Sequence, residues 1–165
     1  RAQHAGLSHW RGITDVNSAS VGIEIVNPGH EWGYRPFPEE QMDSVTQLVA
    51  EITRTFSIEP RNVVGHSDVA PARKEDPGEL FDWERLARLG LAVPRPTEKL
   101  VDPGWPDAAF LLALERYGYG ISDGRAAVVA FQRRFRPNNL DGVIDGECRA
   151  ILLSLLLAYE GGGAM

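Results

Sequence analysis

The sequence has 165 residues, of which 43% are hydrophobic and 24% charged, and its formal net charge is -6. This composition suits a globular protein of one or two domains, and the absence of a long basic run argues against nucleic acid as the main partner. The longest apolar run, Ala150 to Ala158, is too short to span a membrane, so we expect no transmembrane segment in the chain. Cys148 is the one cysteine, which excludes an intrachain disulfide and a cysteine-based zinc cluster.

The stretch from Ser20 to Asn27 predicts a β-strand, because its β-branched residues alternate with other residue types. Glu24 interrupts the apolar pattern of this stretch. A buried carboxylate at this place would have a raised pKa and would serve as the general base for a metal-bound water. The alternation equally allows Glu24 to lie on the solvent face of an edge strand, and the sequence leaves both interpretations open.

Two helices are expected in the first part of the chain, and the first of them is amphipathic. One begins at residues 38–40, where acidic side chains suit the positive end of the helix dipole, and it ends near Thr55 to Ser57. The other spans Phe81 to Leu91, with Asp82 as its candidate N-terminal cap.

The stretch from Val63 to Gly78 carries the most concentrated set of reactive side chains. His66 follows an apolar pair that is typical of the end of a buried strand, and Lys74 and Asp76 come later in a proline-rich loop. A neutral imidazole and a carboxylate are the ligands of a catalytic zinc that keeps one position open for water. A lysine beside them would stabilise negative charge on an attacked carbonyl oxygen. Because a structural histidine and a solvated turn show the same pattern, spacing alone does not decide between these interpretations.

The second part of the chain has a different character. Residues 96–106 are rich in proline and weakly patterned, which predicts a linker. Three short helices are expected after it, over Ala108 to Tyr117, Arg125 to Phe135 and Glu147 to Tyr159. We therefore predict two domains, at residues 1–95 and 107–160, and the second shows no catalytic pattern.

Several ordered motifs together resemble a known family. S-V-G-I-E-I-V-N, V-G-H-S-D-V-A-P-A-R-K-E-D-P-G and F-D-W, with the starting run R-A-x-H-A-G, resemble the zinc-dependent N-acetylmuramoyl-L-alanine amidases of the type 2 amidase family, which share a fold with peptidoglycan recognition proteins. The run A-V-V-A-F-Q-R-R-F-R-P, followed by D-G-V-I-D, is similar to a peptidoglycan-binding domain. The resemblance implies an α/β fold with a mixed central sheet flanked by helices, followed by a small all-α domain of three helices.

The resemblance also implies catalytic roles for matching residues. His66 and Asp76 match two of the three zinc ligands of the family. Glu24 matches the carboxylate that handles the attacking water, and Lys74 matches the cation near the scissile carbonyl. The third zinc ligand, a histidine, and the strand that bears it are expected outside this chain, on an associated N-terminal fragment of the same precursor.

The family's substrate cleft has counterparts near the start of the chain. The resemblance implies that Ala2 and Trp10 line this cleft near His4. Gln3 stands where the family often has tryptophan, so one wall of the cleft differs from the family pattern.

The expected activity is zinc-dependent hydrolysis of the amide bond between N-acetylmuramic acid, or its anhydro form, and L-alanine in peptidoglycan or muropeptides. The order of the motifs is most similar to periplasmic, outer-membrane-associated members, so we expect the chain in the bacterial cell envelope. A non-catalytic module that binds peptidoglycan is the first alternative, and a wall-anchoring protein that relies on the C-terminal unit is the second. A serine or cysteine hydrolase is disfavoured, because the sequence has no G-x-S-x-G and Cys148 has no histidine near it.

Overall fold

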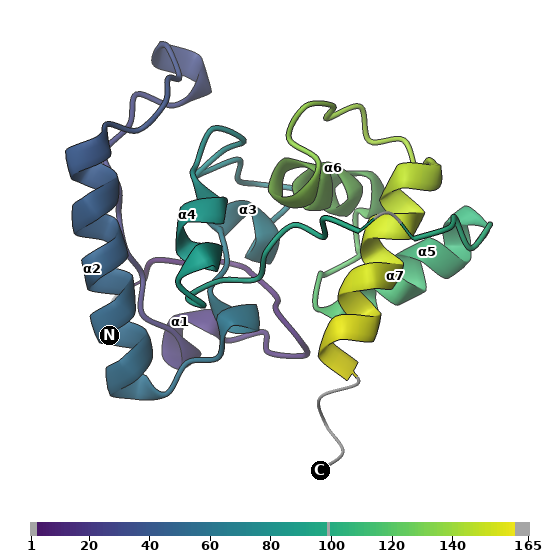
Figure 1. The fold of residues 1–165 in the computed structure, drawn as a ribbon, viewed down its shortest axis with the longest axis horizontal. Helices are drawn as coiled ribbons and strands as arrows, with labels where there is room; N and C mark the ends of the chain where they lie inside the picture. The colour runs from purple at the N-terminus through teal and green to yellow at the C-terminus, as the bar shows by residue number, and fades with distance from the viewer. Residues whose placement is uncertain (1–2, 99, 161–165) are drawn as a thin grey trace.

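A computed structural model of the chain describes residues 3–98 and 100–160, and its regular structure in these ranges is helical. The longer helices are α2 (Glu39–Phe56), α5 (Asp107–Tyr117), α6 (Gly124–Phe135) and α7 (Gly146–Glu160). The shorter ones are α1 (Val16–Ala19), α3 (His66–Val69), α4 (Trp83–Arg88) and the 3-10 turns η1 (His30–Trp32) and η2 (Pro60–Asn62). Figure 1 shows α2 along one side of the molecule and α5, α6 and α7 gathered on the other, with α3 and α4 between them. In the described ranges, no helix combines the length and the apolar character that crossing a bilayer requires.

The expected mixed central sheet is absent from residues 3–98 and 100–160, so this prediction was wrong. Residues 20–28 have no regular secondary structure and pair with no strand among the described residues. The alternation nevertheless indicated which side chains point inward, since Ile23 and Ile25 pack against the apolar face of α2 and Glu24 is exposed. A strand is stabilised by backbone hydrogen bonds to a neighbouring strand, and the side-chain pattern of one segment does not reveal whether that neighbour is present.

Helix α2 forms where the sequence predicts it, and it supplies one of two groups of buried apolar side chains. Its inward face consists of Met42, Val45 and Val49, which pack with side chains of the region around α4. Ser57, in a left-handed conformation with a φ of 52°, ends the helix and donates its backbone N–H to Thr53.

Helix α4 confirms the predicted cap. The carboxylate of Asp82 accepts a hydrogen bond of 2.9 Å from the backbone N–H of Arg85, which satisfies one of the free donors at the start of the helix. The helix is shorter than the expected stretch from Phe81 to Leu91, and Leu86 is its buried residue.

A second group of buried side chains connects the three C-terminal helices to the first half of the chain. Phe110 of α5 and Phe131 of α6 belong to the same apolar cluster as Trp10 and Val69. The helices lie close to their predicted positions. The packing crosses the expected linker at residues 96–106, and the division into two domains stays a prediction.

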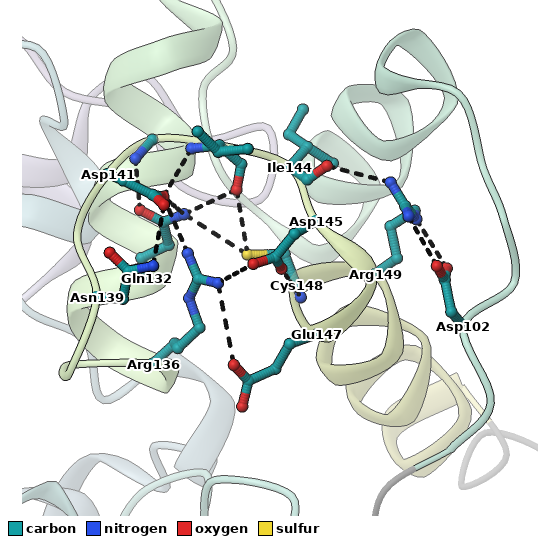
Figure 2. Close-up of polar contacts among 12 residues, drawn as sticks. Asp102, Gln132, Arg136, Asn139, Asp141, Ile144, Asp145, Glu147, Cys148 and Arg149 are labelled. Atoms are coloured by element: carbon teal, nitrogen blue, oxygen red, sulfur yellow. Dashed lines mark hydrogen bonds and ion pairs between the residues drawn. The ribbon is translucent and has the colours of Figure 1, made fainter.

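The loop between α6 and α7 is held by polar contacts, which Figure 2 shows. The carboxylate of Asp141 is surrounded by donors at 2.9 to 3.0 Å. These donors are Gln132 Nε2, Arg136 Nη2, Asn139 Nδ2 and the backbone N–H of Val143. The buried Arg136 also pairs with Asp145. Because hydrogen-bond donors occupy the Asp141 carboxylate, we assign this acidic loop a structural role.

The expected linker is fastened to α7 by a two-point contact that Figure 2 also shows. Asp102 accepts hydrogen bonds of 2.7 Å from both Nε and Nη2 of Arg149. A bidentate pair of this kind fixes orientation as well as distance, so this part of the linker is anchored to α7.

Candidate metal-binding and catalytic site

His66 and Asp76, ten residues apart in the sequence, face each other in the structure. His66 is the first residue of α3, and its Nδ1 lies 3.0 Å from Oδ2 of Asp76. The backbone N–H of Ser67 donates to the carbonyl oxygen of Asp76 at 2.9 Å, which closes the loop between the two residues. A 3-10 turn and irregular backbone precede His66, so the buried strand expected before it was also wrong.

The second nitrogen of the His66 ring also has a partner. Nε2 lies 3.3 Å from the carbonyl oxygen of Ala5, which can only accept a hydrogen bond. Arg73 Nη2 donates to the same carbonyl at 2.7 Å and to that of Leu7 at 2.8 Å, which holds the acceptor in place. Metal-binding histidines usually donate their second ring N–H to a carbonyl or carboxylate in this way. Nε2 thus has the kind of partner that such histidines use, and Nδ1, which hydrogen-bonds to Asp76 in the structure, is the nitrogen that would bind a metal.

The donor pair fits zinc. With bonds of about 2.0 Å and tetrahedral angles, neighbouring zinc ligands are roughly 3.3 Å apart, and His66 Nδ1 and Asp76 Oδ2 are separated by 3.0 Å. Within residues 3–98 and 100–160, His, Cys, Asp and Glu side chains do not gather in groups of three that could hold a metal ion. The two residues thus fit part of a zinc site, and a complete site needs at least one further protein donor.

The electrostatics favour the ligand form of Asp76. The hydrogen bond with His66 lowers the pKa of Asp76, partial burial opposes this shift, and the charge of Lys74 lowers the pKa further. The carboxylate is therefore ionised at neutral pH. Lys74 is half-buried, and its backbone N–H donates to Ala70 at 3.0 Å, so the lysine belongs to the same loop as both donors.

Glu24 and His4 lie on neighbouring segments. Nε2 of His4 is 2.8 Å from Oγ of Ser20, and its ring covers Gly22, where an added Cβ would lie 2.6 Å from the ring Cγ. Glu24 is exposed within residues 20–28, which agrees with the solvent-facing side chain of the second interpretation, although no edge strand is present among the described residues. The roles of Glu24 as general base and of His4 in substrate binding stay predictions.

Trp10 occupies a packing position. It is 7% exposed, and its ring stands edge-on to Tyr119 at 5.3 Å and to Tyr117 at 6.2 Å between centroids. Its Nε1 donates to Oδ1 of Asn62 at 3.4 Å. The expected contribution of Trp10 to the substrate cleft stays a prediction, and Ala2 lies outside the described residues.

Sequence reasoning missed Asp68, which is buried beneath the site with 2% exposure. Its Oδ1 accepts a hydrogen bond of 2.7 Å from the hydroxyl of Tyr119. Burial raises the pKa of Asp68, while the charge of Arg134 and the bond from Tyr119 oppose the shift. A carboxylate within the apolar stretch that follows His66 was the available signal, since a buried acid needs partners.

Comparison with known proteins identifies the family. Residues 1–79 match the family model described as N-acetylmuramoyl-L-alanine amidase. The solved complex of the N-acetylmuramyl-L-alanine amidase AmiD from Escherichia coli, with the substrate anhydro-N-acetylmuramic acid-L-Ala-D-gamma-Glu-L-Lys, is 35% identical with a TM-score of 0.85. That match covers 94% of this chain and 68% of AmiD. The chain belongs to the N-acetylmuramoyl-L-alanine amidase family.

Two further comparisons place the chain within this amidase family. The curated sequence of AmiD from Escherichia coli (strain K12) is 39% identical over 178 residues, which cover 96% of this chain and 64% of AmiD. The chain thus spans slightly less than two thirds of that relative. AmpDh3 from Pseudomonas aeruginosa, solved in complex with an anhydromuramic pentapeptide, is 34% identical with a TM-score of 0.85, and the match covers 96% of this chain and 70% of AmpDh3.

Proposed function

We propose that this chain forms part of a zinc-dependent amidase. The enzyme hydrolyses the amide bond between N-acetylmuramic acid, or its anhydro form, and L-alanine in peptidoglycan or muropeptides. The observation that carries the proposal is the facing pair of His66 Nδ1 and Asp76 Oδ2, with the other ring nitrogen directed at the carbonyl of Ala5. The muropeptide ligands of AmiD and AmpDh3 support the choice of substrate.

In this proposal, zinc is held by His66, Asp76 and a third ligand, a histidine from outside the chain. The support is the ligand count, since catalytic zinc takes three protein ligands and the described residues bring two donors together. We also propose that an associated N-terminal fragment of the same precursor supplies this histidine. Residues 20–28, whose backbone pairs with no described strand, offer such a fragment a backbone edge.

The chemistry divides among the chain's own residues. When bound, zinc supplies an electrophile that polarises the scissile carbonyl and lowers the pKa of a water. The carboxylate of Glu24 accepts the proton of the attacking water and returns it to the leaving amine. The ammonium group of Lys74 stabilises the negative charge that develops on the carbonyl oxygen.

The proposal also concerns place and partner. Because peptidoglycan is the substrate source, we assign the protein to the periplasm of the bacterial cell envelope. The helices α5, α6 and α7 serve as the unit that binds the wall, as the similarity of residues 127–137 to a peptidoglycan-binding motif indicates. The polar network around Asp141 supports a fixed loop on this unit.

The experiment uses the full-length protein, its zinc content and a defined anhydro-muropeptide. We expect about one zinc per active site and release of a free peptide with L-alanine at its amino end, detected by mass spectrometry. A chelator should stop the release, and added zinc should restore it. A protein that binds the muropeptide but never releases the peptide at full zinc loading would be a recognition module instead.

A further inference from the structure

Helix α3 carries both a proposed ligand, His66, and a buried anchor, Asp68. Residues two apart on a helix point to nearly opposite sides, so one side chain faces the site while the other faces the interior. Four residues are too few for a helix that is stable by itself. The orientation of His66 therefore depends on the contacts that hold Asp68.

The anchor has one partner at each carboxylate oxygen. Oδ2 of Asp68 accepts the backbone N–H of Gly65 at 2.7 Å, and Oδ1 accepts the hydroxyl of Tyr119 at 2.7 Å. Tyr119 is fully buried, with Phe131 of α6 edge-on to its ring at 6.2 Å. The tyrosine comes from the chain just after α5, so the C-terminal helices reach the backbone turn that precedes His66.

Arg134 of α6 contacts the chain around α4, at Trp83 and Val93. Its guanidinium carbon lies 3.2 Å from the ring centroid of Trp83, and its Nη2 donates to the carbonyl of Val93 at 3.4 Å. The side chain is 8% exposed, and its charge acts on the buried Asp68. Helices α3 and α6 pack against each other, as Figure 1 shows.

Arg133, the neighbour of Arg134 in α6, reaches the other end of the same loop. Its Nη2 lies 3.8 Å from Oε1 of Glu75, and its Nε lies 3.6 Å from Oε2 of Glu79. These acids enclose Asp76 in the sequence. His30 adds contacts of 3.3 Å to Glu75 and 3.0 Å to Glu79, so the segment after Lys74 is held by two basic side chains.

We propose that Tyr119 and Arg133, here called the clamp, position the loop that carries both proposed metal ligands. Tyr119 holds the end of the loop that bears His66, and Arg133 holds the end that bears Asp76. The inference rests on the proposed function for the identity of the metal. It assigns a structural part in the amidase site to the helical unit, in addition to any binding of the wall.

The test compares variants of the full-length protein in three measurements. Tyr119→Phe removes one hydroxyl, and Arg133→Gln removes one charge. We expect each to weaken zinc binding about ten-fold in competition with a chromophoric chelator, since outer partners of metal ligands affect affinity on this scale. Amide hydrogen exchange should accelerate in residues 65–80 and stay unchanged in α2, and the visible spectrum of the cobalt-substituted protein should change.

Matched controls come from the same elements. Tyr117→Phe removes a hydroxyl from a buried residue two positions from Tyr119, and Arg125→Gln removes a charge from α6 on the side of the Asp141 loop. Both controls should keep wild-type zinc affinity and wild-type exchange in residues 65–80. Arg133→Lys, which retains a charge, should recover part of the affinity lost in Arg133→Gln.

The outcomes separate the clamp from the function. Wild-type zinc affinity and wild-type exchange of residues 65–80 in both Tyr119→Phe and Arg133→Gln would refute the clamp while the amidase proposal stands. A full-length wild-type protein that binds no zinc would overturn the proposed function. In that case the exchange measurement alone decides whether Tyr119 and Arg133 hold the loop.

Discussion

The two interpretations of Trp10 lead to opposite results when the residue is replaced by alanine. The indole is buried and stands edge-on to Tyr117 and Tyr119. A buried tryptophan removes roughly 200 Å² from water, which corresponds to about 5 kcal/mol at about 25 cal/mol per Å² as an upper bound. Measured replacements of large buried aromatic residues by alanine cost about 3–5 kcal/mol. We therefore expect Trp10→Ala to destabilise the protein by about 4 kcal/mol.

The assay combines stability and kinetics. For a protein of this size, about 4 kcal/mol corresponds to a fall in melting temperature of roughly 8–16 °C, which circular dichroism detects. Trp10→Phe keeps an aromatic ring against Tyr119 and loses the bond to Asn62, so it should cost about 1–2 kcal/mol. At a temperature where this variant is folded, its KM for an anhydro-muropeptide should stay within about two-fold of wild type. A buried Trp10 makes no contact with the substrate, so replacing it should leave substrate binding unchanged.

A different pattern would refute the packing argument. If Trp10→Ala melts at the wild-type temperature and its KM rises ten-fold, the indole contacts substrate and contributes little to the core. The role in the substrate cleft that the resemblance implies for Trp10 would then be supported.

Three further predictions concern the site and its support. Metal analysis should show that His66→Ala loses bound zinc, and full zinc occupancy in this variant would contradict the ligand assignment. Glu24→Gln should retain zinc, and steady-state kinetics should show its kcat lowered by about 10²–10⁴-fold. The hydrogen bonds from Arg149 lower the pKa of Asp102 from 3.8 to about 2, so its contribution to stability is present above pH 4 and is lost as the pH falls through 2. Urea unfolding should show Asp102→Asn less stable than wild type at pH 7 and progressively closer to it between pH 4 and pH 2, and a gap independent of pH would exclude this origin. Asp82→Ala should cost about 1 kcal/mol in the same measurement at pH 7 through loss of the cap on α4, and an unchanged midpoint would show that the cap contributes nothing.

The helices could be predicted because their signals are local. Residues 38–40 and the apolar spacing that follows determine where α2 begins and which face it buries. Asp82 has the side chain that a helix start requires, and its cap is present. The sheet could not be predicted in the same way, since residues 20–28 show a strand pattern but have no partner strand among the described residues. Pairing depends on a second segment, about which a local pattern says nothing.

The site shows the same division between local and distant information. Motif spacing placed His66 and Asp76 together, because both lie on one short loop. The contact of Asp68 with Tyr119 joins residues 51 positions apart in the sequence, and no spacing rule connects them. Arg133 escaped notice for a similar reason, since its partners Glu75 and Glu79 lie far from it in the sequence. Long-range polar contacts to buried groups are determined by the packing of the whole molecule.

The apolar core that joins the two halves of the chain limits which amide bonds the proposed enzyme can reach while its helical unit is bound to the wall. A binding module on a flexible tether raises the local concentration of substrate and lets the catalytic unit reach many bonds around one anchoring point. Here Phe131 shares one apolar cluster with Val69, three residues after His66, and Asp102 fastens the expected linker to Arg149 of α7. A glycan strand held by α5, α6 and α7 would therefore meet the metal site at a constant offset, and geometry rather than tether length would select the stem peptide that is cut.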